Sequence, residues 1–492
     1  PQHRRQRQMC IRDRLWTCQC GKSFFFMYRF NANIKKLIVD TDTPVSIYLK
    51  IRDYYPNSIL LESSDYGAKD NSYAYICCNP IAEFNVKNNV ITTSFPDKKQ
   101  QKKSIDKNCD LLSELKLFMQ KFDLKCEINS SNKFITKAIF GYQSYSSVEY
   151  FEKIEFKNSY EGDEIPVMNY RLYENIIVIN TFNNEAHVIS YNTDTNTIDK
   201  IKNLIRSKKT NQYKFKTKGK LESNVNDEVY KKMVEKGIKH CMRGDVFQIV
   251  LSRKFYQGFS GDEFMVYRHL RSINPSPYLF YFDYGSFKIF GSSPEAQLVI
   301  NKNKAEIHPI AGTFKRTGND AEDKIKAIKL FEDNKENSEH MMLVDLARND
   351  LSRSCTNVAV EKDREIQFYS HVIHLVSKVT GKLKYDNNKI IGETFPAGTL
   401  TGAPKHMAMQ LIEKYESSKR SFYGGAIGFI GFDYSYNHAI IIRSFLSKNK
   451  KLFFQAGAGI VSKSSKINEL NEVNNKVRAL KKSIEQAEKY EE

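Results

Sequence analysis

The sequence predicts an α+β protein built of antiparallel β-sheets packed with helices. Short β-type runs separated by turn residues fill the first part of the chain, from about Phe26 to Tyr191. In the second part, long β runs are mixed with irregularly placed helical segments, which favours antiparallel sheets over a doubly wound parallel sheet. With 492 residues the chain is too long for one ordinary core, so two domains are expected.

Changes in composition divide the chain into four expected parts. Residues 1–25 form an arginine-rich leader, and Gln19 and Lys22 break its apolar stretch, which excludes a secretory signal. An organellar transit peptide and a leader foreign to the native protein both stay open, and we favour the second. Residues 26–206 are expected as a mostly β domain, residues 207–222 as a polar linker, and residues 223–492 as the second domain.

Individual elements follow from local patterns. Residues 175–180 and 186–191 are β runs joined by polar turn residues, which predicts a hairpin. The second domain opens with a helix that Ser223 or Asn226 caps and Gly244 ends, followed by a strand over 246–252. Beyond these we expect a helix over 340–351, a strand over 370–381, a helix after 405, strands over 424–432, 438–447 and 452–461, and a last helix from about Lys466.

The formal net charge of +19 raises the question of nucleic acid, but the lysines are scattered and show none of the usual binding signatures. We therefore expect no nucleic-acid partner, although a non-catalytic basic binding protein stays open as an alternative. A positive field also attracts small anionic substrates. No apolar run reaches the length of a membrane span, so no membrane partner is expected. Nine cysteines without a paired CxxC pattern indicate reduced thiols in the cytoplasm, or in a plastid if the leader is a transit peptide.

Two pairs of carboxylates have helical spacing. Glu336 and Glu339 lie three residues apart, as do Glu469 and Glu472, so each pair occupies one face of its helix. Four converging carboxylates would suit a hard cation such as Mg²⁺. Either pair by itself is more often a solvated helix face.

Four glycine-rich segments occur in the second domain, and we interpret them as turns: residues 311–313, 397–399, 423–425 and 456–459. Bare backbone permits close approach to an anion, and Arg443 and Lys405 could supply positive charge. Because no phosphate-binding loop pattern is present, the expected ligand is an anion without phosphates. His374 lies in a strand on the same face as Val372 and Val376, where a single histidine is usually structural.

Seven segments occur in an order and at spacings that resemble the chorismate-utilising enzymes, and among them the anthranilate synthase component I family. They are PIAGTFKRTG, SEHMMLVDLARNDL, HVIHLVSKVTG, GTLTGAPK, FYGGAIGF, AIIIRSFL and QAGAGIV. The likeness covers nearly all of residues 223–485. Two further segments, LLESSD at Leu60–Asp65 and NPSPYLFYF at Asn274–Phe282, resemble the family's tryptophan-binding motifs, with Leu279 where a methionine is common.

The resemblance implies a role for each matching residue. Glu295 corresponds to the family's general acid and His374 to its active-site histidine. Thr399 would line the ring pocket, and Mg²⁺ would bind Glu339 and Glu472, with Glu336 and Glu469 nearby. The residues implied to hold chorismate are Gly312, Thr313, Tyr423, Arg443, Gly457, Ala458 and Gly459. The residues implied to bind tryptophan as an inhibitor are Leu61, Ser63, Pro277, Tyr278 and Leu279.

The implied reaction adds ammonia at C2 of chorismate, expels the C4 hydroxyl and eliminates pyruvate to leave anthranilate. Relatives that aminate C4 are thought to use a lysine where this chain has Ala311, and a methyl group cannot be a nucleophile. Relatives that add water carry a lysine base where this chain has Gln248. A 4-amino-4-deoxychorismate synthase component I is the alternative. No glutaminase motif is present, so a separate glutamine amidotransferase subunit is expected to supply the ammonia.

Overall fold

The computed structural model describes residues 28–63, 72–106, 109–127, 134–154, 156, 164–192, 194, 196–368, 372–384 and 388–490, with the backbone of 16–17 and 23–24. The expected leader, residues 1–25, lies outside the described residues except for two paired strands of two residues, β1 (Trp16–Thr17) and β2 (Ser23–Phe24).

Most described strands pair into one antiparallel sheet, as the α+β class predicts. From one end the order is β13 (Phe215–Ser223), β14 (Gln248–Gly261), β26 (Lys451–Ile460), β25 (Ser444–Lys448), β16 (Phe287–Ser293), β15 (Tyr278–Asp283), β5 (Ile59–Ser63), β6 (Tyr73–Lys87), β11 (Met168–Asn180), β10 (Ala138–Gln143), β23 (Ala426–Gly431), β24 (Tyr436–Ile440), β17 (Ala296–Asn301), β18 (Lys304–Ile307), β21 (Val372–Leu383) and β20 (Cys355–Phe368).

The remaining strands of this sheet pair with the strands named above or with one another. Strand β22 (Gly402–Ala403) pairs with β14, β19 (Ile310–Lys315) with β21, β7 (Val90–Ser94) with β6, β8 (Gln100–Ser104) with β7, β12 (Glu185–Ser190) with β11, and β4 (Asn33–Ile38) with β12. Separately, β3 (Tyr28–Asn31) and β9 (Phe122–Lys125) form a parallel pair.

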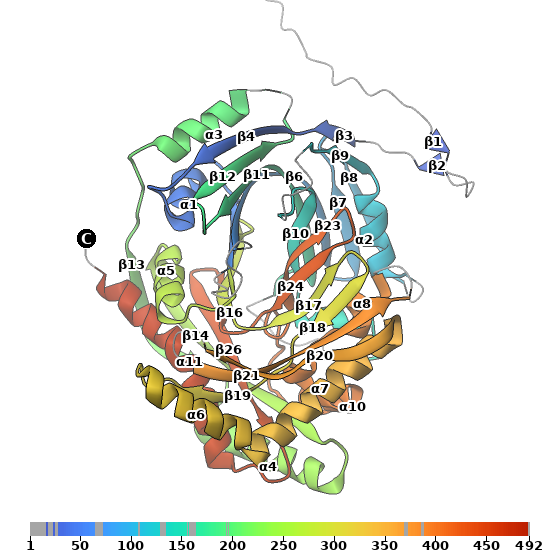
Figure 1. Ribbon diagram of the computed structural model, residues 1–492, viewed down its shortest axis with the longest axis vertical. Helices are drawn as coiled ribbons and strands as arrows, with labels where there is room; N and C mark the ends of the chain where they lie inside the picture. The colour runs from blue at the N-terminus through green and yellow to red at the C-terminus, as the bar shows by residue number, and fades with distance from the viewer. Residues whose placement is uncertain are drawn as a thin grey trace, which may run out of the picture.

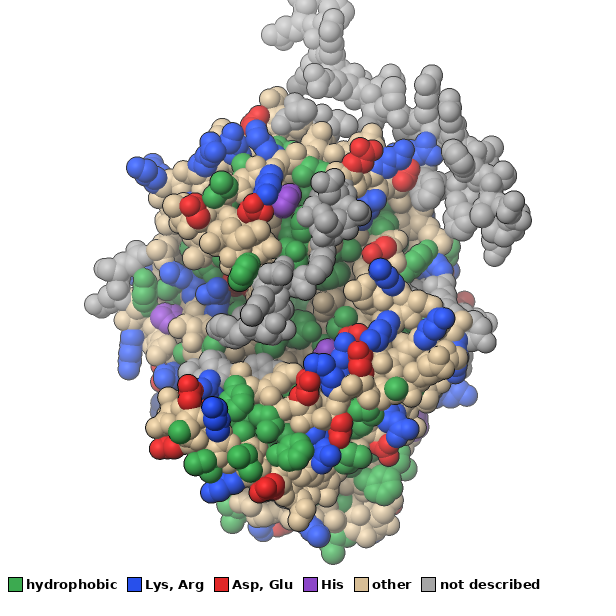
Figure 2. Space-filling view, viewed as in Figure 1, with side chains coloured by type: hydrophobic (Ala, Val, Ile, Leu, Met, Phe, Trp, Pro, Cys, Tyr) green, Lys and Arg blue, Asp and Glu red, His purple; other side chains and the backbone are tan. Residues whose placement is uncertain are grey.

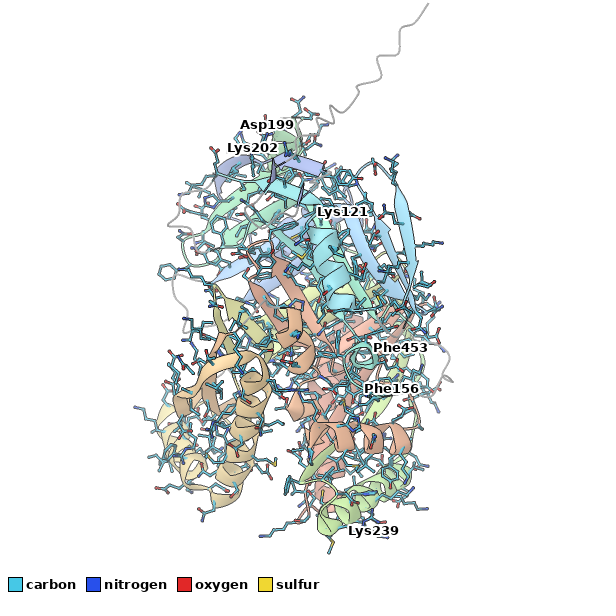
Figure 3. The ribbon with its side chains drawn as sticks, turned by 90° about the vertical axis from the view of Figure 1, so that its right-hand side faces the viewer. Lys121, Phe156, Asp199, Lys202, Lys239 and Phe453 are labelled. Atoms are coloured by element: carbon cyan, nitrogen blue, oxygen red, sulfur yellow. The ribbon has the colours of Figure 1, made fainter. Side chains whose placement is uncertain are left out.

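The helices lie mainly around the outside of the strands (Figure 1). They are α1 (Pro44–Arg52), α2 (Leu111–Met119), η2 (Tyr145–Tyr150), α3 (Asn196–Arg206), α4 (Asp227–Arg243), α5 (Phe264–Ile273), α6 (Asp320–Glu332), α7 (Asn334–Ser354), α8 (Asn388–Glu393), α9 (Gly398–Thr401), α10 (Lys405–Tyr415) and α11 (Lys466–Lys489). Helices α4 and α10 pack on β14, α11 packs on β26, and α7 packs on β19, β20 and β21. In the side view, α3 with Asp199 and Lys202 lies at the upper end and α4 with Lys239 at the lower end (Figure 3).

Strands from both sides of the expected linker share this sheet. The pairs β5–β15 and β10–β23 each join a strand from the first expected domain to one from the second. Both large hydrophobic cores also draw on the two sides, as Phe84 with Leu298 and Ile177 with Phe445 illustrate. Part of the segment expected as a linker forms β13 and pairs with β14. The division at residues 207–222 stays a prediction.

Local patterns predicted several elements well. The hairpin forms as β11 and β12, and α4 begins with the Asn226 side chain accepting a hydrogen bond from the Val229 amide (2.9 Å) and ends at Gly244 with φ of 80°. The strand expected over 438–447 is instead two strands, because the chain leaves β24 and enters β25 through a turn in which Arg443 has φ of 48°. Residues 456–459, expected as a turn, lie inside β26, where they pair with β14.

Basic and acidic side chains share the visible surface, and the described cysteines form no disulfides. Figure 2 shows lysine and arginine side chains interspersed with acidic ones over the visible face. All six cysteines in the described ranges are free. Among the helices that the structure describes, none is both long and apolar enough to cross a membrane.

Candidate active site

A bulge in β19 brings three predicted residues together: Gly312, Glu336 and His374. The pairing of β19 with β21 shifts between Ala311 and Thr313, and Gly312 between them has φ of 65°. A Cβ atom on Gly312 would lie 2.7 Å from Leu330 Cδ1 and 3.3 Å from Glu336 Oε2. Glycine is therefore required both by its left-handed backbone and by the close packing of α6 and α7. The Thr313 side chain lies outside the described residues.

The bulge also orients His374. The imidazole Nδ1 lies 2.8 Å from the carbonyl oxygen of Gly312, and the side chain is 4% exposed. Because a carbonyl can only accept, Nδ1 carries the proton and Nε2 is the basic nitrogen of the neutral ring. Burial, together with the nearby charge of Arg443, lowers the pKa of His374 to about 4. At neutral pH this histidine can therefore accept a proton but is not an acid.

The pKa of Glu295 is shifted in the opposite direction from that of His374. It follows β16, is only 9% exposed and accepts a hydrogen bond from Thr399 Oγ1 at 3.1 Å. Burial raises the pKa of Glu295 to about 8, against the opposing effects of Thr399, Lys476 and Arg443. The carboxyl group is protonated at neutral pH. A neutral basic histidine and a protonated acid in one site are what proton removal and proton donation require.

Arg443 supplies the positive charge between these two groups. Its field affects the pKa values of both Glu295 and His374, and Nη1 lies 3.5 Å from Asn274 Oδ1. Burial lowers the pKa of Arg443 below its ordinary range, and the charge of Glu295 opposes this shift. A planar guanidinium in this position suits a substrate carboxylate.

Tyr423 and the glycines of β26 form another wall. Tyr423 is 3% exposed, and its hydroxyl is hydrogen-bonded by the Gly457 amide. Gly459 lies beside Gln248, since a Cβ atom there would be 2.4 Å from Gln248 Nε2. The backbone of Gly457–Gly459 therefore contacts two polar groups: the Tyr423 hydroxyl lies at Gly457, and the Gln248 amide lies at Gly459.

Two lysines make contacts that the sequence did not predict. Lys405, expected to face an anionic ligand, instead binds Asp350 Oδ2 at 2.9 Å, and both side chains are 12% exposed. Its charge is therefore met within the protein. Lys476 belongs to none of the sequence motifs. Its Nζ binds the Gly457 carbonyl at 2.9 Å and Glu472 Oε1 at 2.6 Å. The helical spacing of Glu472 and Lys476 on α11 is the signal that could have indicated it.

The four predicted metal ligands, Glu336, Glu339, Glu469 and Glu472, all lie on described helices, α7 and α11. Among the described residues, no group of three or more His, Cys, Asp or Glu side chains is arranged to hold a metal ion. Mg²⁺ commonly takes only one or two protein carboxylates and completes its shell with substrate and water, so Glu339 and Glu472 would suffice. The Glu472 carboxylate binds the Lys476 ammonium, so this position attracts positive charge. Magnesium stays a prediction.

The two tryptophan-type motifs lie side by side. In the β5–β15 pairing Ser63 is opposite Tyr278, and the Glu62 carboxylate binds Arg271 at 2.9 Å. Leu279 is 3% exposed, Leu61 is half-buried, and Pro277 directly precedes β15. Ser64 and Asp65, the end of the first motif, lie outside the described residues.

Comparison with known proteins shows the family of the chain. The profile of the family described as chorismate binding enzyme matches residues 59–482. The chain belongs to this chorismate-binding family. Anthranilate synthase component 1 from Aquifex aeolicus (strain VF5) is 35% identical over 486 residues, covering 93% of this chain and 95% of that protein.

Solved structures of similar proteins share the fold. Anthranilate synthase component I from Streptococcus pneumoniae TIGR4 superposes with a TM-score of 0.72 at 28% identity, covering 91% of this chain and 100% of that one. The menaquinone-specific isochorismate synthase from Escherichia coli has a TM-score of 0.69 at 16% identity, covering 93% and 95% of the two chains. The second likeness concerns the fold alone. One fold therefore carries proteins that are named for different reactions, and individual residues must distinguish them.

Proposed function

We propose that this chorismate-binding enzyme is the ammonia-using large subunit of an anthranilate synthase, which converts chorismate and ammonia to anthranilate and pyruvate. The observation that carries the proposal is a buried, protonated Glu295 in a site without a lysine at position 311 or 248. Ala311 offers no covalent route to C4, and the Gln248 amide cannot deprotonate water. The names of the similar full-length proteins support the same reaction.

The site residues have distinct tasks in this reaction. Arg443 and Tyr423 hold the carboxylate of the enolpyruvyl group. Glu295 donates its proton to the departing C4 hydroxyl, which leaves as water. After ammonia has added at C2, His374 takes up the C2 proton through Nε2 as pyruvate is eliminated.

Three finer features belong to the proposal. Glu339 and Glu472 would hold Mg²⁺, which when bound supplies positive charge for the ring carboxylate. A separate glutamine amidotransferase subunit supplies ammonia, a role supported by the designation of the similar proteins as component 1 of an anthranilate synthase. Tryptophan binds beside the β5–β15 pair and inhibits the enzyme, which is the expectation raised by the motifs that contain Ser63 and Tyr278.

Product analysis tests the proposal directly. The purified chain is incubated with chorismate, ammonium at mildly alkaline pH and Mg²⁺, and anthranilate is followed by fluorescence and pyruvate by a coupled assay. Both should form in equal amounts, and glutamine should not replace ammonium until the partner subunit is added. Formation of isochorismate, salicylate or 4-amino-4-deoxychorismate would contradict the roles given to Gln248 and Ala311. Retained affinity for random DNA at physiological salt without turnover would favour a basic binding protein.

A further inference from the structure

A buried ion pair lies behind the candidate active site and takes no part in the chemistry described so far. Glu416 follows α10, and Arg420 lies four residues later, with side chains 4% and 1% exposed. The guanidinium binds the carboxylate through two parallel hydrogen bonds, Nε to Oε2 at 3.0 Å and Nη2 to Oε1 at 2.7 Å. This is the bidentate geometry that only arginine provides.

The other donors of Arg420 reach two further segments. Nη1 donates to the Leu400 carbonyl at 2.5 Å, and Nη2 donates to the Val250 carbonyl at 2.7 Å. The partner carboxylate also binds β14, because Glu416 Oε1 accepts from the Ser252 amide at 2.8 Å and hydroxyl at 2.6 Å. One ion pair therefore joins α9, β14 and the segment after α10.

Each joined segment carries a wall of the candidate site. Leu400 directly follows Thr399, the hydroxyl that binds Glu295. On β14, Val250 and Ser252 lie opposite Gly459 and Gly457 in the strand pairing.

The third segment carries Tyr423. The Arg420 carbonyl accepts the Tyr423 amide at 3.0 Å, and the guanidinium lies 5.7 Å from the Tyr423 ring centroid. The guanidinium also lies 4.9 Å from the centroid of the Tyr145 ring, which contacts Phe156, labelled in Figure 3.

We propose that Arg420 is a positioning residue for the reaction: through Glu416, Leu400 and Val250 it fixes Thr399, Tyr423 and the β26 glycines relative to one another. The inference rests on the proposed function. A buried ion pair is weak evidence for stability, because apolar residues of similar volume often serve as well. What apolar residues cannot do is hold carbonyls from separate segments at fixed angles, which the planar guanidinium does here.

The test variant is Arg420→Lys, which keeps the charge but loses the fork. We expect kcat/KM for chorismate to fall roughly 10- to 100-fold, the scale expected when reacting groups are displaced by about 1 Å. The alkaline limb of the pH profile should also move to higher pH, because Glu295 loses the Thr399 hydrogen bond that lowers its pKa. Thr399→Val should shift the alkaline limb of the pH profile by the same amount, and the double variant should show no further shift of this limb.

A matched control separates positioning from general stability. Arg171 binds Glu83 Oε1 at 2.8 Å between β11 and β6, with an Arg171 side chain that is 12% exposed. Arg171→Lys should lower the denaturation midpoint but leave kcat/KM and the pH profile unchanged. If Arg420→Lys does not fold, Glu416→Gln replaces it, since the amide keeps the volume and weakens the fork.

Hydrogen exchange gives a readout that does not depend on turnover. In Arg420→Lys, peptides that cover residues 397–402, 421–425 and 455–460 should exchange faster than in the unaltered chain, while peptides from β6 and β11 should not. If the unaltered chain makes no anthranilate, the proposed function fails, and this exchange pattern still decides the positioning role. Unchanged exchange, or an equal loss of kcat/KM in Arg171→Lys, would overturn the inference.

Discussion

The raised pKa of Glu295 links stability to pH in a way that one substitution can reveal. Burial moves this pKa from its ordinary value of 4.5 to about 8, which corresponds to about 5 kcal/mol in favour of the protonated form. Because the folded-state pKa is the higher one, the stabilisation is complete below about pH 4.5 and is lost as pH rises through about 8. Glu295→Gln removes this titration while keeping the shape of the side chain.

The two proteins should therefore diverge with pH. Relative to the unaltered chain, the Gln variant should gain about 4 kcal/mol in free energy of unfolding between pH 4.5 and pH 8. Urea denaturation followed by circular dichroism at a series of pH values measures the difference. In parallel, turnover should fall roughly 10²- to 10⁴-fold at pH 7, since the general acid is gone.

A carboxylate with the opposite shift provides the control. Although burial opposes the change, hydrogen bonds from His308 and Lys378 lower the pKa of Glu306 to about 2. Its stabilising effect is present above the unfolded-state pKa and is lost as pH falls towards 2, so Glu306→Gln should destabilise the protein at neutral pH. Parallel stability curves for the unaltered chain and Glu295→Gln from pH 5 to pH 9 would refute the assignment of a buried, protonated acid.

The remaining predictions concern the base, the metal and the effector. His374→Asn should lower kcat roughly 10²- to 10⁴-fold with little change in KM, and an unaltered kcat would exclude His374 as the base. Glu339→Ala and Glu472→Ala should each abolish Mg²⁺-dependent turnover while circular dichroism stays native, and calorimetry should show that Mg²⁺ binding in the presence of chorismate is lost. Tryptophan should inhibit the unaltered chain, and Ser63→Arg should relieve the inhibition at unchanged kcat, whereas the absence of any tryptophan effect on the unaltered chain would end the effector assignment.

Local patterns in the sequence were enough to predict the fold class and many elements. The ends of α4 follow from Asn226 and Gly244, which act on hydrogen-bonding groups within one helical turn. The hairpin of β11 and β12 follows from alternation and a short polar turn. Resemblance of motifs also predicted Glu295, His374 and Arg443 as one site, and the structure brings them together.

Only the tertiary structure decided how those residues behave. Glu295 is an acid at neutral pH because burial by segments distant in the chain raises its pKa, and this effect outweighs the hydrogen bond from Thr399 on α9, which lowers it. Lys405 is neutralised by Asp350, and Arg420 joins α9 to β14, although neither contact has a periodic signal in the sequence. Hydrogen-bond geometry and desolvation depend on which distant surfaces meet, whereas helix caps and strand alternation depend on near neighbours, so the sequence by itself determined the elements and the tertiary structure determined the chemistry.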